Sequence, residues 1–133
     1  MKRILVAYDG SEPARRALDT TIELAKQSEA LVTVVSVVPV HPGRVPIDPW
    51  DDALVHARAL HEAKELLAGQ GIIAEFLEPT GDPAKTIERI VEEGAYDTVV
   101  VGSRGLGMVS RFLQGSVSEH VATHAAATVV VSR

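Results

Sequence analysis

The chain has 133 residues, 46% of them hydrophobic and 23% charged, so we expect one globular domain over residues 1–133 with its own core. The net charge of −5 and the scattered basic residues argue against nucleic acid as a partner, since binding to a phosphate backbone relies on clustered lysines and arginines. Without cysteine, disulfides, zinc-thiolate sites and thiol catalysis are excluded. No apolar run has the length of a membrane span and no signal-peptide pattern is found, so we expect a cytoplasmic protein without a membrane partner.

The first half of the chain alternates short β-branched runs with longer amphipathic stretches, a pattern typical of alternating strands and helices. A loop rich in proline, residues 39–49, interrupts this alternation and is longer than most such connections. It is either a mobile cover over a ligand or a plain surface connection. The predicted elements of this half are a strand over residues 4–8, a helix over 12–29, a strand over 31–38 and a helix over 48–68.

The second half repeats the same alternation. Its predicted elements are a strand over residues 72–77, a helix over 82–94, a strand over 97–101, a helix over 116–123 and a strand over 128–132. Strands that are apolar on both faces predict a doubly wound α/β fold, with a five-stranded parallel sheet and helices on both faces. Ligands of such folds bind beyond the carboxyl ends of the strands, so the segments after the first, second and fourth strands are the candidate site.

A segment rich in glycine and serine, residues 102–119, follows the fourth predicted strand. Glycine lets backbone amides approach a phosphate closely, and a helix that begins at Ser116 would add free N–H groups and the positive end of its dipole. A structural interpretation is also open, because Ser116 and Glu119 have the spacing of a capping box and the glycines could serve a tight turn.

Two common nucleotide motifs are excluded. A P-loop requires a lysine after its second glycine, whereas Gly107 is followed by Met108. A dinucleotide fingerprint requires Gly-x-Gly-x-x-Gly after the first strand, where this chain has Asp9-Gly10-Ser11.

The spacing Gly102-x-x-Gly105, then nine residues, then Gly115-Ser116 resembles the ATP-binding signature of the universal stress protein family. The resemblance implies a Rossmann-like, adenine-nucleotide-binding fold with strand order 3-2-1-4-5. It also implies ATP as the ligand, with Mg²⁺ accompanying the phosphates. Further segments that resemble the family, and extend the resemblance over the entire chain, are residues 4–11, 97–105 and 129–131.

The resemblance implies a phosphate site in the glycine-rich segment. Its phosphate-binding residues would be Gly102, Gly105, Gly115 and Ser116, with the amide of Val117 nearby. Arg104 lies within the same segment and either supplies positive charge to the phosphates or is a solvated surface side chain.

The same resemblance implies contacts to the rest of the nucleotide. Asp9 matches an acidic residue near the ribose and the metal ion, and its alternative role is to cap the turn before the first helix. The main chain of Val37 matches the position that contacts adenine, although Val37 could also be plain core. Ala7 would lie beside this pocket, and Val101 would flank the base or the sugar.

The last strand is implied to form the edge of a homodimer through Val129, Val130 and Val131, although Ala126-Ala127-Thr128 stands where family members often have a proline. We expect a nucleotide-dependent regulatory or stress-response protein with at most weak ATP hydrolysis, because no Walker lysine and no evident base form a hydrolytic centre. The alternatives are a slow ATPase or autophosphorylating phosphotransferase, and a dimeric interaction module without nucleotide.

Overall fold

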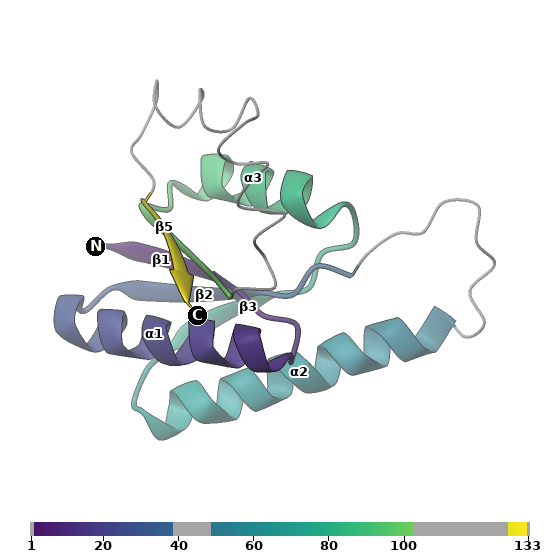
Figure 1. Cartoon of the computed structure of the whole chain (residues 1–133), viewed down its shortest axis with the longest axis horizontal. Helices are drawn as coiled ribbons and strands as arrows, with labels where there is room; N and C mark the ends of the chain where they lie inside the picture. Colours follow the sequence, from purple (N-terminus) through teal and green to yellow (C-terminus); the bar gives the residue numbers. More distant parts are fainter. Residues whose placement is uncertain (1, 39–48, 103–127, 133) are drawn as a thin grey trace.

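The computed structural model describes residues 2–38, 49–102 and 128–132, without the side chains of residues 49–56 and 83–84 (Figure 1). In this part of the chain the strands form one sheet of five parallel strands in the order β3-β2-β1-β4-β5. The predicted fold class and strand order are confirmed. The strands are β1 (Arg3–Ala7), β2 (Leu31–Val35), β3 (Ala74–Leu77), β4 (Thr98–Gly102) and β5 (Thr128–Ser132).

Helices cover both faces of the sheet, with α1 and α2 on one face and α3 on the other (Figure 1). Successive side chains of a strand point to opposite faces, so each strand contributes to two cores. Ile4 and Val6 of β1 pack toward α1 and α2, whereas Leu5 packs toward α3. The described helices are α1 (Glu12–Ser28), α2 (Pro49–Gly69) and α3 (Pro83–Gly94). The predicted helix over residues 116–123 and the loop over residues 39–48 lie outside the described residues.

Two of these helices begin at the carboxyl edge of the sheet with a polar cap. The Ser11 hydroxyl accepts a hydrogen bond from the Ala14 amide at 3.3 Å, and the Asp82 carboxylate accepts one from the Lys85 amide at 3.0 Å. Each cap is followed by a proline in the first turn, where a missing N–H costs nothing. The sheet edge that should carry the ligand is therefore bordered by two helix N-termini.

Two predicted strand limits are wrong. The strand predicted over residues 31–38 ends at Val35, because β1 turns away after Tyr8 and leaves the following residues a partner on one side only. The strand predicted from residue 72 begins at Ala74, because the Ile72 amide donates to the Leu67 carbonyl at 2.9 Å and completes the end of α2. Among the described helices, none is both long enough and apolar enough to cross a bilayer.

Candidate functional site

The candidate site lies at the carboxyl edge of the sheet. β1 is the point where strand order reverses, since β2 and β3 lie on one side of it and β4 and β5 on the other. The predicted site residues that the structure brings to this edge are Ala7, Asp9, Val37, Val101 and Gly102. The others, Arg104, Gly105, Gly115, Ser116 and Val117, lie outside the described residues.

The main chain of Val37 faces the gap that β1 leaves. Along a strand, successive N–H and C=O groups point to alternate sides. Val35 accepts a hydrogen bond from the Tyr8 amide on the β1 side, and Ser36 donates to Leu77 on the β3 side, both at 2.9 Å. Val37 therefore faces the β1 side, one step beyond the last β1–β2 hydrogen bond. Within the described residues, neither its N–H nor its C=O has a partner.

The side chains of Val37 and Val101 are part of the core on the α3 side. They are 9% and 1% exposed, and Ala7 packs against the same cluster while half-buried. The two interpretations of Val37 therefore concern different parts of the residue. Its side chain lies in the core, whereas its main chain has no hydrogen-bond partner among the residues that the structure describes. Val101 is enclosed in the same cluster.

Asp9 is exposed and shapes the turn before α1, which is the role that the sequence analysis gave as the alternative to binding ribose and metal. Its Oδ1 atom accepts a hydrogen bond from the Ser11 amide at 2.9 Å, which shapes the connection from β1 to α1. Its Oδ2 atom has no hydrogen bond to another described residue. One carboxylate oxygen suits Mg²⁺, which takes one or two carboxylates and completes its octahedron with phosphates and water. The described residues contain no group of three acidic or histidine side chains that would hold a metal without a nucleotide.

Gly102, at the end of β4, is in close contact with the start of α1. A Cβ atom on this residue would overlap the Pro13 carbonyl oxygen and lie 3.0 Å from the Ala14 amide nitrogen. Glycine is thus required at this position by helix packing, whether or not a phosphate binds there. The sequence analysis left open a structural role for the glycines in a tight turn. It could not predict that Gly102 packs against α1.

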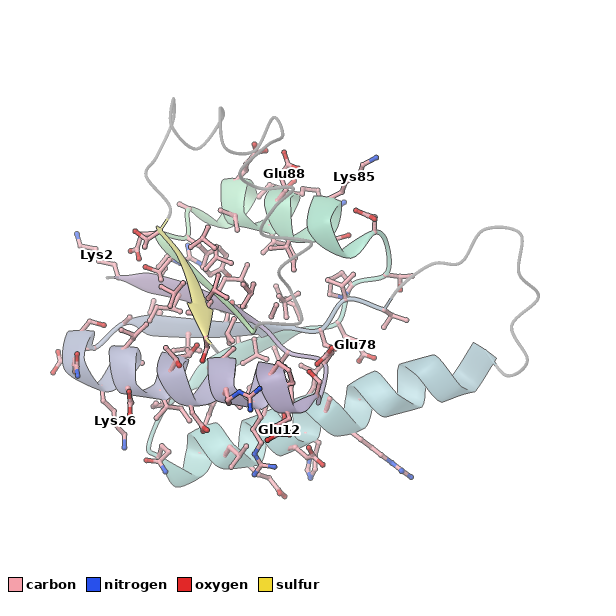
Figure 2. The ribbon with its side chains drawn as sticks, in the orientation of Figure 1. Lys2, Glu12, Lys26, Glu78, Lys85 and Glu88 are labelled. Carbon is pink, nitrogen blue, oxygen red and sulfur yellow. The ribbon has the colours of Figure 1, made fainter. Side chains whose placement is uncertain are left out.

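The site edge carries exposed acidic side chains. Figure 2 shows Glu12 and Glu78 toward the carboxyl end of the sheet, together with Lys85 in the first turn of α3, and Lys2 and Lys26 toward the opposite end. Asp9 adds a third carboxylate at the first of these ends. Burial, and after it the negative charge of Glu62, raises the pKa of the adjacent Tyr8, so its phenol stays neutral at physiological pH. A triphosphate at this edge would therefore need a metal ion or local donors to offset its charge.

The sequence patterns missed the segment between β3 and α3. Its Thr80 forms a bridge with Val38, which places it at the same edge as Val37. The available signal was a proline and a glycine, Pro79 and Gly81, directly after a strand at the ligand end of a parallel sheet.

Comparisons with known proteins agree over the full length. The model of the family described as Universal stress protein family matches residues 1–133. Universal stress protein YxiE of Bacillus subtilis is 30% identical over 150 residues, covering 98% of this chain and 98% of that protein. A putative universal stress protein of Staphylococcus aureus strain USA300 is 32% identical over 143 residues, covering 99% of this chain and 84% of that protein.

Solved structures show the same fold. A universal stress protein family member from Burkholderia pseudomallei is 29% identical with a TM-score of 0.72, covering 98% of this chain and 94% of that one. The universal stress protein of Archaeoglobus fulgidus in complex with dAMP is 23% identical with a TM-score of 0.71, covering 100% and 98%. An Arabidopsis thaliana family protein with AMP bound is 24% identical with a TM-score of 0.69, covering 99% and 91%.

Proposed function

The chain belongs to the universal stress protein family, and on that premise we propose that it binds ATP at the carboxyl edge of its sheet and acts as a nucleotide-dependent regulatory protein. The observation that carries the proposal is the main chain of Val37, whose N–H and C=O have no partner among the described residues and lie side by side where β1 turns away.

This pair of groups suits adenine. The base presents an acceptor at N1 beside a donor at its 6-amino group, and a peptide N–H with the C=O of the same residue offers the complementary pair. Both groups of Val37 point to one side of the strand, so one base could bond to both. Ala7 is half-buried beside this position and would give the base an apolar neighbour.

Nucleotides bound to relatives support an adenine ligand. The Archaeoglobus protein was solved with dAMP, the Arabidopsis protein with AMP, and a further universal stress protein with cAMP. Adenine and a pentose that carries one phosphate group are common to all three ligands. ATP is proposed here because the Gly102-x-x-Gly105 and Gly115-Ser116 spacing resembles the ATP-binding signature.

The triphosphate would be held by donors after β4. In the proposal Gly105, Gly115, Ser116 and the amide of Val117 bind the phosphates, and Arg104 offsets their charge. Asp9 would supply the protein ligand of the accompanying Mg²⁺, whose charge is needed at an edge that also carries Glu12 and Glu78. Gly102 would contribute its main chain.

The regulatory role is proposed in preference to catalysis. Among the exposed carboxylates at this edge, Asp9 is committed to a turn through one oxygen and assigned to the metal through the other, and Glu12 is paired with Arg16 at 3.4 Å. The proposal therefore assigns neither of them as a general base for attack on a γ-phosphate. A slow ATPase is the competing function, and the cytoplasm remains the proposed compartment.

Homodimerisation through β5 is part of the same proposal. β5 is the last strand of the described sheet, and its valines are only partly buried. An exposed β-branched edge is a surface that a second copy could cover by strand pairing.

Asp9→Asn tests the function, because asparagine keeps an acceptor for the Ser11 amide while removing the charge that a metal requires. Calorimetric titration of the nucleotide-free protein should give one Mg-ATP site per chain. We expect the variant to bind Mg-ATP about tenfold more weakly, equivalent to about 1.4 kcal/mol.

AMP without metal is the matched control ligand, and its affinity should be nearly the same for both proteins. If the unmodified protein binds neither ATP, ADP nor AMP at millimolar concentration, the proposed function is wrong. If it binds ATP but Asp9→Asn changes nothing, Asp9 is only a turn residue. Phosphate release measured in the same samples distinguishes a regulator from a slow ATPase.

A further inference from the structure

The end of β3 and the segment between β3 and α3 hold the main chain on both sides of Val37. The Ser36 amide donates to the Leu77 carbonyl at 2.9 Å, and the Val38 amide donates to the Pro79 carbonyl at 2.8 Å. The Gly81 amide returns a hydrogen bond to the Val38 carbonyl at 3.0 Å. These bonds continue the β2–β3 pairing three residues past the end of β2, where β1 no longer contributes a partner.

The orientation of Val37 therefore depends on its two neighbours. The last hydrogen bond from β1 reaches Val35, and Val37 has none to a described residue. The direction of its N–H and C=O follows from the peptide planes that Ser36 and Val38 share with it. If the bonds of Val38 were released, the donor and acceptor of Val37 would no longer have a fixed direction.

Gly81 occupies a position that a larger residue does not fit. Its φ of +154° is essentially restricted to glycine, and a Cβ atom would lie 2.8 Å from the Thr86 hydroxyl oxygen. Thr86 is 7% exposed in the first turn of α3, where its amide donates to the Asp82 carbonyl at 2.9 Å. The chain at Gly81 thus passes tightly between Val38 and α3.

We propose that Gly81 is a positioning residue for base recognition, which fixes the Val37 main chain through Val38 so that adenine is preferred over hypoxanthine. The inference rests on the proposed nucleotide function and adds a basis for its selectivity. Hypoxanthine carries a donor at N1 and an acceptor at O6, the reverse of adenine. Only a main chain with a fixed direction discriminates between these two edges, because a mobile one could rotate to satisfy either.

The experiment compares Gly81→Ala with Gly71→Ala. Gly71 also has a positive φ, +74°, but it lies at the opposite end of β3 and its Cβ would meet no atom within 4 Å. Affinities for ATP and inosine 5′-triphosphate are measured for both variants and for the unmodified protein. We expect the preference for ATP to fall about tenfold in Gly81→Ala and to remain unchanged in Gly71→Ala.

The ratio of the two affinities is informative because a general loss of stability lowers both affinities together. An unchanged ratio in folded Gly81→Ala would overturn the inference and leave the proposed function intact. Equal affinity of the unmodified protein for the two nucleotides would do the same. Failure of that protein to bind any adenine nucleotide would instead overturn the proposed function.

Pro79→Gly keeps the inference testable if Gly81→Ala does not fold. This change retains the carbonyl that accepts from Val38 but loosens the segment, so the preference for ATP should fall in the same direction by a smaller factor. Amide exchange measured by NMR should show faster exchange at Val38 in this variant. A preference and a Val38 exchange rate equal to those of the unmodified protein would contradict the inference.

Discussion

Asp97 organises the end of the sheet opposite to the candidate site. Its carboxylate accepts hydrogen bonds from the Lys2 amide at 2.7 Å, the Arg3 amide at 3.1 Å and the Thr98 hydroxyl at 2.8 Å. Its main-chain carbonyl accepts from the Thr128 amide at 2.8 Å. One residue thus joins the beginnings of β1, β4 and β5. Burial alone would raise the pKa of Asp97, but the bonds from Lys2, Thr98 and Arg3 outweigh it and lower this pKa.

Asp97→Asn should lower the free energy of unfolding by about 1–2 kcal/mol at pH 7, because an amide is a weaker acceptor for these donors. The folded-state pKa of Asp97 lies below the unfolded value of about 3.9, so its contribution is complete above that value and is lost as the pH falls through the folded pKa. Urea unfolding of both proteins at pH 7 and pH 3 should therefore show a smaller difference at pH 3.

Asp19→Asn is the control for this measurement, since Asp19 is exposed on α1 and has no hydrogen bond to another described side chain. It should change stability by less than about 0.5 kcal/mol at either pH. If Asp97→Asn lowers the free energy of unfolding by the same amount at both pH values, the charge of Asp97 is not the cause of the lost stability.

At the level of elements, the end of β4 and the start of α1 depend on each other through Gly102. A Cβ atom at Gly102 would meet the main chain of Pro13, which cannot move without shifting the first turn of α1. Gly102→Ala should therefore lower the free energy of unfolding by about 1–3 kcal/mol, and thermal unfolding measures this loss. Gly69→Ala, where a Cβ meets nothing within 4 Å, should be neutral or stabilising.

The comparison of Gly102→Ala with Gly69→Ala also decides how a loss of nucleotide affinity in a Gly102 variant is interpreted. A Gly102 variant that loses nucleotide affinity would not by itself indicate a phosphate contact, because the position is already constrained by α1. If Gly102→Ala is as stable as Gly69→Ala, then the contact with Pro13 is relieved at little cost. The contact with Pro13 would in that case not explain why position 102 is a glycine.

The elements themselves could largely be predicted from local patterns. The spacing of apolar residues predicted every described strand and helix. A helix or strand that is buried on one or both faces carries its apolar residues in a recognisable pattern along the sequence. The limits of β2 and β3 could not be predicted, since they depend on where β1 turns away and on how α2 ends. The role of Gly81 was missed for the same reason, because its partners Val38 and Thr86 are set by tertiary packing.

The candidate site was predictable to a different degree for each residue. The β1–α1 turn at Asp9 is local, so its structural role could be weighed from the sequence beside the functional one. The close approach of Gly102 to Pro13 spans most of the chain and leaves no local signal. At Val37 the side chain lies in the core, while the main chain has no partner in the described part of the chain. This distinction requires the hydrogen-bond pattern of the assembled sheet.

In the whole molecule, the hydrogen-bond network at Asp97 and the candidate site occupy opposite ends of the sheet, and β5 forms one of the two edges of the described sheet. The Thr128 amide points toward β4, where it bonds to Asp97. By alternation the amide of Val130 also points toward β4, whereas those of Val129 and Val131 point away from the sheet. No described strand lies beyond β5, so these outward groups are the ones that a second copy would pair with.

Val131→Pro should separate the proposed dimer while leaving the sheet intact. Proline removes only an outward N–H at this position, and an edge strand tolerates it. Because the dimer is two-fold symmetric, the substitution removes one intersubunit hydrogen bond from each subunit. The dimer dissociation constant should therefore rise about hundredfold, equivalent to about 2.8 kcal/mol. Analytical ultracentrifugation across a concentration series measures the constant, and circular dichroism checks the fold. Val130→Pro is the control, because it removes a bond to β4 and should destabilise the sheet itself. An unmodified protein that stays monomeric, or a Val131→Pro variant that dimerises as strongly as the unmodified protein, would exclude pairing through this edge.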